Sequence, residues 1–530
     1  MASKHRPFVQ RSRREFLKTV GGGAGAVLTA STAHAHHHPR PWPQSLPYLD
    51  QRTYIHNMEV IAHLPEGRAG QMMAIGSKRF LFSGRNVLDV SDPRDPKMVN
   101  SGGGQNGQLA YNATLKKWIL LSSSEAPRMV ATPFGKYEDA KSVAEFKNFK
   151  GLRGLRMWDA TDPTNIVLLS EYSTGQTGSG VHIDGTYYDG GKYAYLAAAP
   201  DDSFTHLLSC ILPLSHCLMI VDVSDPTNVK PVANWWVPGQ RNTEVEEFKK
   251  WKVVQGRLPA TLGSTKTLDD VIKTFPELKY PALDRMPYTQ LHGPVCVPKK
   301  IEDGGTRGYG AWSAFGFMIH DLSEITKPRV IGRFDPTPTY GMDGIPFHTI
   351  WVGTLDRGFV VTVSEALNPD CNESSLPLWV VDVRDETNPI SIAQLPRPVP
   401  PAEAPFTDYC FARGRFSAHI CPPLQAPGRP SQTFFPVSFF NAGLRCYDLS
   451  EPTQPKEVAY FVPPHGGDIS NPLSFNRPTE NVTVEWDRNI IYVGSTTGLY
   501  VLTCPALGEP TFESMPVSQW SLPGLNAGAP

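Results

Sequence analysis

Short runs of apolar and β-branched residues, each closed by a polar residue, recur along the chain. The clearest run is Leu218-Met219-Ile220-Val221-Asp222, which is followed by a Val-Ser-Asp-Pro turn. The pattern returns at Leu155–Asp159, Phe317–Asp321, Leu378–Asp382 and Leu444–Asp448, and in weaker form at Arg85–Asp89 and Leu499–Thr503. These seven copies start 70, 63, 99, 61, 66 and 55 residues apart. Runs this short, ended by turn residues, predict β-strands rather than helices.

The residues around each copy predict three more strands per unit. A strand that often begins with histidine comes first, an aromatic strand such as Tyr193–Leu196 second, the aspartate-ended strand third, and a strand such as Pro231–Trp236 last. The aspartate is expected to accept backbone N–H bonds in the turn that follows. Seven small antiparallel sheets in one chain are best closed radially, because this leaves few exposed edges. The sequence therefore predicts an all-β fold, a seven-bladed β-propeller over residues 55–525.

Closing the ring requires a strand from outside the seventh unit. Residues 55–65 resemble the last strand of a unit, and the stretch from Phe512 to Leu522 competes for the same role. Two insertions interrupt the repeat, at residues 134–152 and 238–287, and their charged and apolar residues suit amphipathic helices. Because long insertions in a rigid scaffold usually lie over one face, we expect a small helical cap over one end of the central channel.

The first 35 residues have the features of an export signal. Arg13 and Arg14 stand in a Ser-Arg-Arg-Glu-Phe-Leu-Lys motif typical of twin-arginine signals, and an apolar Gly/Ala-rich stretch follows. The Ala-His-Ala at residues 33–35 fits the pattern of a cleavage site. We therefore expect residues 1–35 to be a signal peptide, residues 36–54 a linker, and the twin-arginine export machinery a partner, with the periplasm or cell exterior as destination. No later stretch reaches about 18 consecutive apolar residues, so no transmembrane segment is expected in the mature chain.

Charge and cysteine content exclude some functions and leave others open. The 50 basic and 51 acidic residues nearly cancel, and no basic block is present, so nucleic acid is not an expected partner. Eight cysteines in an exported chain permit disulfides. Cys210 with Cys217, and Cys410 with Cys421, flank short loops and are candidates for local bridges, although the sequence does not fix the pairing. No C-x-x-C spacing, nucleophile elbow, phosphate loop or dinucleotide fingerprint supports the chemistry that those motifs carry.

The strongest chemical signal is a histidine at the start of the first strand in four consecutive units, namely His182, His292, His348 and His419. At the same repeat position the seventh unit presents Glu480, and the first two present Gln71 and Gln108. Because the first strand of a propeller blade lines the central channel, we expect the imidazoles to converge in an arc that is open on one side. Converging imidazoles bind iron, copper or zinc, and Glu480 is a candidate extra ligand. We predict an iron or copper ion at this place.

Two carboxylates are candidates to orient the imidazoles from behind the metal. Asp184 lies two residues after His182, on the same face of a regular strand, and Glu365 follows the second strand of the fifth unit. Histidines at a fixed repeat position can instead hydrogen-bond the neighbouring blade and lock adjacent sheets without any metal. Surface or loop roles are expected for the irregularly placed histidines, His206, His216, His320 and His465.

The pentapeptides and the Asp-Pro turns after most of them resemble the LVIVD-repeat family of bacterial exported β-propellers, which is named for this pentapeptide. The resemblance covers nearly all of the chain after the signal. It implies the propeller fold and no particular reaction, because many members have no assigned activity. In architecture alone, the channel histidines are also similar to those of two seven-bladed groups. These are the carotenoid cleavage oxygenases, with four histidines on iron, and the selenium-binding protein/methanethiol oxidase group, which is linked to copper.

These features lead to competing hypotheses of function. The first is an exported metal-dependent oxidoreductase, of oxygenase or oxidase type, that acts on a small apolar or aromatic substrate in a histidine-lined channel. The alternative is a non-catalytic propeller that binds a partner protein or an envelope polysaccharide. A hydrolase or lactonase that uses a metal-bound water is a third hypothesis.

Overall fold

The structure is a computed structural model. It describes residues 45–102, 107–126, 148–204, 216–244, 290–336, 347–366, 369–371, 376–468 and 477–513, together with Glu145 and Glu247. The predicted signal peptide with Arg13 and Arg14, and residues 36–44 of the predicted linker, lie outside the described residues. Most of the two predicted helical insertions lies outside them as well, so the cap stays a prediction.

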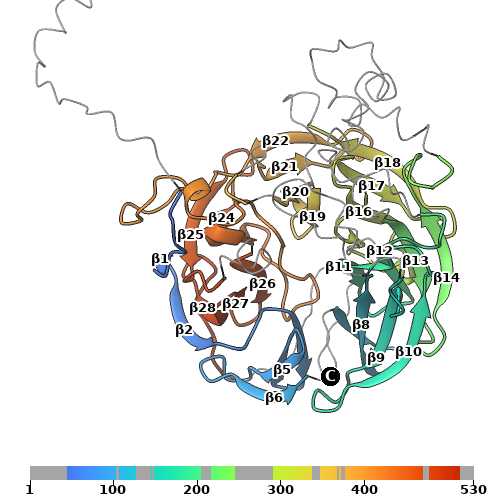
Figure 1. Ribbon diagram of the computed structural model, residues 1–530, viewed down its shortest axis with the longest axis horizontal. Helices are drawn as coiled ribbons and strands as arrows, with labels where there is room; N and C mark the ends of the chain where they lie inside the picture. The colour runs from blue at the N-terminus through green and yellow to red at the C-terminus, as the bar shows by residue number, and fades with distance from the viewer. Residues whose placement is uncertain are drawn as a thin grey trace, which may run out of the picture. The chain divides into compact units, whose positions relative to one another are not determined.

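The described chain forms seven sheets, each of four antiparallel strands, arranged as a β-propeller (Figure 1). Apart from four short 3-10 turns, at Ile301–Asp303, Leu355–Arg357, Tyr409–Phe411 and Phe440–Ala442, and the helical residues Glu145, Asn148 and Glu247, its regular elements are strands. The predicted all-β, seven-bladed fold class is therefore confirmed. Among the described residues, no helix is long and apolar enough to cross a membrane.

Six of the blades follow the predicted strand order from the channel to the rim. Their first strands are β3 (Gln71–Ile75), β7 (Gln108–Asn112), β11 (Val181–Tyr188), β15 (Val295–Cys296), β19 (Phe347–Trp351) and β26 (Thr479–Glu485). Their second strands are β4 (Lys78–Ser83), β8 (Lys117–Ser124), β12 (Tyr193–Ala198), β16 (Arg307–Ala311), β20 (Phe359–Ser364) and β27 (Ile490–Ser495). Their third strands are β5 (Asn86–Asp89), β9 (Gly154–Asp159), β13 (Cys217–Asp222), β17 (Phe317–Asp321), β21 (Trp379–Asp382) and β28 (Gly498–Thr503). Their outer strands are β6 (Lys97–Ser101), β10 (Val167–Ser173), β14 (Lys230–Trp235), β18 (Arg329–Phe334), β22 (Ile390–Gln394) and β2 (Glu59–Leu64).

The sixth blade departs from this order. It consists of β23 (Phe434–Phe439), β24 (Gly443–Asp448), β25 (Lys456–Val462) and, outermost, β1 (Tyr54–His56). The segment predicted as its first strand pairs with β23 through one isolated bridge, Ala418 to Phe439, and through the bond from the His419 N–H to the Ser438 carbonyl at 2.8 Å. Two prolines at 422–423 offer no N–H groups to continue the ladder, which ends the pairing.

The N-terminal strands close the ring. β2 pairs with β28 and completes the seventh blade, while β1 pairs with β25 in the sixth. Residues 59–64 thus take the closing position, and residues 514–522 of the competing C-terminal stretch lie outside the described residues. Because β2 leads into the first unit and pairs with β28 of the last unit, this pairing joins the two ends of the ring.

The repeat aspartates have the predicted structural role. In six units the aspartate accepts a backbone N–H bond, at 2.8–3.0 Å, from the residue two positions later. These residues are Asp89, Asp159, Asp222, Asp321, Asp382 and Asp448. Each such bond starts the turn that leads from the third strand to the outer strand.

The disulfide pairing differs from the local bridges suggested by the sequence. Cys410 bonds Cys371, which is 39 residues away, and not Cys421. The thiols of Cys421 and Cys217 are free and buried, and Cys210 lies outside the described residues. Cys421 lines the central channel, whereas Cys410 lies on a 3-10 turn of a long connection, so the two cysteines of that pair face different surroundings.

Candidate metal centre

The four predicted histidines lie side by side at one end of the channel. His182 is in β11 and His348 in β19, while His292 precedes β15 and His419 directly follows Ala418, which forms the bridge to β23. Ring centroids are 5.4 Å apart between His182 and His292, 4.3 Å between His292 and His348, and 4.8 Å between His348 and His419. All four side chains are buried. The repeat register therefore places the imidazoles in an arc, as the sequence predicts.

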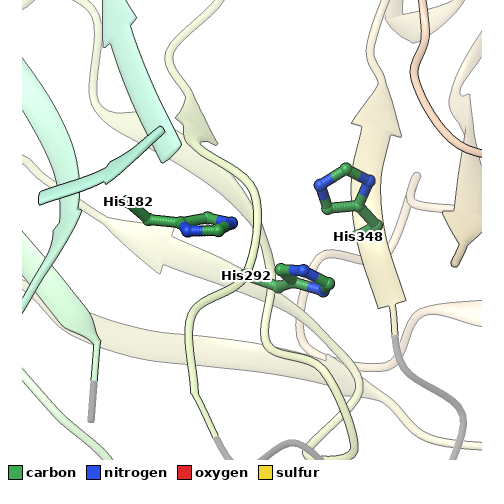
Figure 2. Close-up of side chains that lie close together, drawn as sticks. All are labelled: His182, His292 and His348. Atoms are coloured by element: carbon green, nitrogen blue, oxygen red, sulfur yellow. The ribbon is translucent and has the colours of Figure 1, made fainter. Parts of the chain in front are cut away.

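Three of these rings converge. Figure 2 shows His182, His292 and His348 reaching toward one another from separate segments of the chain. Their ring nitrogens, one from each residue, lie within 4.8 Å of one another. Because nitrogens bound to one ion at about 2.0–2.1 Å are at most about 4.2 Å apart, a bound ion would draw these rings slightly together. His419 belongs to an adjoining group with Asp184 and His348. Among the described residues, no group of this kind contains all four histidines.

Hydrogen bonds fix the tautomers of two of the rings. Nδ1–H of His348 donates to the His419 carbonyl at 2.8 Å, and Nδ1–H of His419 donates to the Glu480 carbonyl at 3.0 Å. Both bonds cross to the next blade, so these histidines also lock adjacent sheets. A neutral imidazole that donates from Nδ1 keeps its lone pair on Nε2. Nε2 of His348 is buried and has no hydrogen-bond partner among the described groups, so it is oriented as a metal ligand would be.

The same two rings are held neutral. Burial, together with the neighbouring His292, lowers the pKa of His348 to about 4. Burial also lowers the pKa of His419 well below its usual value, although the Glu365 carboxylate opposes that shift. A histidine binds a metal through the neutral ring. Both side chains are thus in the ligand form at neutral pH.

Glu365 lies behind the arc, where the sequence suggested an orienting carboxylate. Its Oε2 is 3.1 Å from Nε2 of His292, and its Oε1 accepts a bond from Arg415 at 2.7 Å. Burial raises the pKa of Glu365, but the bond from His292 outweighs burial and holds the pKa well below its usual value. An anionic carboxylate on the far nitrogen of an imidazole fixes that ring and makes it a stronger ligand.

Of the other two predicted carboxylates, Asp184 lies among the histidines and Glu480 does not. Asp184 groups with His348 and His419 and not behind His182, because β11 changes register between Val181 and Thr186 and no longer alternates regularly. This placement makes Asp184 a candidate ligand. The Glu480 carboxylate instead forms ion pairs with two arginines, at 3.4 and 3.2 Å, and only its backbone carbonyl contacts the arc.

Two residues at the site were not found from the sequence. Glu125 follows β8, and its Oε2 is 3.3 Å from Nδ1 of His182. His216 is fully buried beside His182, with ring centroids 5.2 Å apart. His216 lies in a loop, which was one of the two expected placements, but it is fully buried and not at the surface. Its place directly before the apolar strand β13 was the only available signal.

The expected surface or loop role is wrong for His320, which lies in strand β17. His320 is fully buried and accepts a bond from the Trp312 indole N–H at 2.9 Å, and burial lowers its pKa to about 3. His320 therefore serves the core. His465 is also buried, but it lies in a loop, where its Nδ1 accepts a bond from the Gly467 N–H at 3.2 Å, so the expected loop placement holds for it. His206 lies outside the described residues.

A cavity of about 280 Å³ occupies the channel beside the arc. Residues from the inner segments of all seven blades line it, and His419 and Asp184 belong to this lining. Gln71 and Gln108, from the two blades without a histidine or carboxylate at the repeat position, line it as well. The arc therefore has a space next to it that is large enough for a small molecule.

The sequence comparisons add no family to this picture. No known protein-family model matches the chain, and no curated protein matches it. The fold and the site are therefore interpreted from their own geometry.

Proposed function

We propose that this protein is an exported metal-dependent oxidoreductase of oxygenase or oxidase type, with iron or copper bound by His182, His292 and His348. The observation that carries the proposal is the convergence of three buried ring nitrogens within 4.8 Å, in a group where Nε2 of His348 has no hydrogen-bond partner among the described residues. Burying an unsatisfied polar atom costs about 1–3 kcal/mol, which a bound cation would offset.

Neutral imidazoles are the donors that iron and copper share in proteins. His419 and Asp184, which group with His348, are the candidates to complete the coordination. A bound iron or copper would supply oxygen activation or electron transfer. The protein's own contribution is to hold the ligands neutral, oriented and buried.

Glu365 and the backbone carbonyls supply that orientation. Glu365 contacts His292, and the carbonyls of His419 and Glu480 receive the Nδ1 protons of His348 and His419. Arg415 faces the second oxygen of Glu365 at 2.7 Å, which balances the buried negative charge. These contacts fix the orientation of His292, His348 and His419, which favours tight metal binding.

The proposed substrate is a small molecule with an apolar or aromatic body. The cavity of about 280 Å³ is lined partly by Tyr187, Trp351 and Leu424, which suit such a body. Gln71 and Asp184 add polar groups to the same lining and favour a substrate with one polar substituent. The proposed location is the periplasm or cell exterior, reached through the twin-arginine pathway.

A non-catalytic propeller is the second candidate. The observation that favours it is that His348 and His419 already bond the carbonyls of the following blade, which gives them a packing role without metal. In that case the protein would bind a partner protein or an envelope polysaccharide.

Elemental analysis of protein exported by its own signal separates the candidates. The proposal expects at least one iron or copper ion per chain, and oxygen uptake with small aromatic substrates that stops when the ion is removed. Zinc in place of iron or copper would favour hydrolysis by a metal-bound water. Exported protein without any stoichiometric metal would reject the proposal in favour of the binding propeller.

A further inference from the structure

A second group of ligand atoms adjoins the first. Glu125, His182 and His216 each offer one atom, and these atoms lie within 4.8 Å of one another. The side chains are 10%, 2% and 0% exposed. They come from the end of β8 in the second blade, from β11 in the third blade, and from the residue before β13. Only His182 is shared with the group in Figure 2.

The Glu125 carboxylate lies between the two imidazoles. Its Oε2 is 3.3 Å from Nδ1 of His182, and its Oε1 is 3.8 Å from Nε2 of His216. The Ser179 hydroxyl is 2.8 Å from the same nitrogen of His216 and adds an oxygen at this place. Backbone pairing positions the carboxylate, because Glu125 forms an isolated bridge with Gly180 just before β11.

His182 is the residue that the two groups share. Nδ1 faces Glu125, and the same ring also belongs to the group with His292 and His348. The two nitrogens of one imidazole point in different directions, so one ring can serve two ions without moving. A ring that binds a cation at each nitrogen does so as the imidazolate anion, and the displaced proton goes to solvent.

We propose that Glu125, His182 and His216 form a second divalent-metal site, so that the histidine arc holds two ions that share His182. Two imidazoles and one carboxylate are a donor set that proteins use for zinc and for non-haem iron. The carboxylate also brings a negative charge, which the first group of three imidazoles lacks. The inference rests on the proposed function only for the first ion. The ligands of the second ion do not depend on which reaction the first ion supports.

The test counts ions on the full exported chain. The protein is stripped with a chelator and dialysed to equilibrium against zinc alone, and zinc per chain is measured by mass spectrometry. Wild-type protein is expected to bind two zinc ions. Glu125→Gln, which removes the charge and keeps the shape, and His216→Ala should each bind one. His348→Ala should also bind one, because it removes a ligand of the first group.

His63→Ala is the matched control. His63 is an exposed histidine on β2, where its ring stacks on Tyr500, so this variant should keep two zinc ions. Thermal unfolding followed by circular dichroism identifies folded variants. If His216→Ala does not fold, Glu125→Gln decides, because it leaves the imidazoles and the packing in place.

The outcomes separate the two proposals. If wild type binds one zinc ion, Glu125→Gln retains it and His348→Ala loses it, the second site is overturned and the proposed function stands. Two zinc ions in wild type and also in both Glu125→Gln and His216→Ala would place the second ion elsewhere and overturn the inference. No zinc in folded wild-type protein would overturn both proposals.

Discussion

Replacing His348 by alanine separates a metal ligand from a packing residue. The side chain has two functions in the structure, since Nδ1–H donates to the His419 carbonyl at 2.8 Å and Nε2 points into the group with His182 and His292. The substitution removes both. Blade packing should survive, because the remainder of β19 stays paired with β20.

The two functions predict effects of different size. Leaving the His419 carbonyl without its donor costs about 1–3 kcal/mol. A chain of this length unfolds with an entropy near ~1 kcal/mol per kelvin, so this loss lowers the thermal midpoint by only about 1–3 °C. A metal present at 1,000 times its dissociation constant stabilises the folded state by about 4 kcal/mol, or roughly 4 °C on the same scale. Loss of a direct ligand should weaken binding by more than the 10–100-fold typical of residues behind the ligands.

The assay is thermal unfolding of wild type and His348→Ala, each with metal and after chelation, together with metal content. Wild type should lose roughly 4 °C on chelation, in line with the linkage estimate. The variant should show a small drop in the chelated state and little further response to metal. Equal metal content in the two proteins, with the same small drop in both states, would refute the metal role and leave only packing.

Three further results follow from other parts of the chain. Arg13→Lys with Arg14→Lys should leave precursor in the cytoplasm, and normal secretion of this variant, assayed by cell fractionation, would show that another route carries the protein. His320 has a folded-state pKa of about 3 against about 6.5 when unfolded, so its contribution to stability is lost as the pH falls from about 6.5 toward 3, at ~1.4 kcal/mol per pH unit. Urea unfolding of His320→Gln should therefore show a weaker loss of stability between pH 7 and 4.5 than wild type, and parallel profiles would contradict this cause. Loss of the Cys371–Cys410 disulfide in a Cys371→Ser variant should cost about 2–4 kcal/mol by urea unfolding, since the bond closes a loop of 39 residues, and undiminished stability would show that the bond is absent.

The repeat made the fold and the arc predictable. Each pentapeptide and its aspartate turn depend on local chemistry, so seven copies identified seven third strands. A repeat also converts a sequence position into a place in space. His182, His292, His348 and His419 share one repeat position, and their rings lie next to one another for that reason.

Features that depend on contacts between distant segments were not predictable. Glu125 and His216 have no counterpart in the repeat, and they meet His182 only because the segments that carry them lie beside the start of β11. The change of register in β11 alters the direction of the Asp184 side chain, and no sequence pattern marks this change of register. The disulfide joins two long connections between strands. Its pairing depends on how the propeller brings these connections together and not on the spacing of the cysteines along the sequence.

The most direct test of the metal centre is anomalous X-ray scattering from crystals of the exported protein. Data collected on both sides of the iron and copper absorption edges would locate either element. The account predicts a peak at one of these edges, about 2.0–2.2 Å from ring nitrogens of His182, His292 and His348. Well-ordered imidazoles with no anomalous peak among them, in protein purified without chelator, would contradict it.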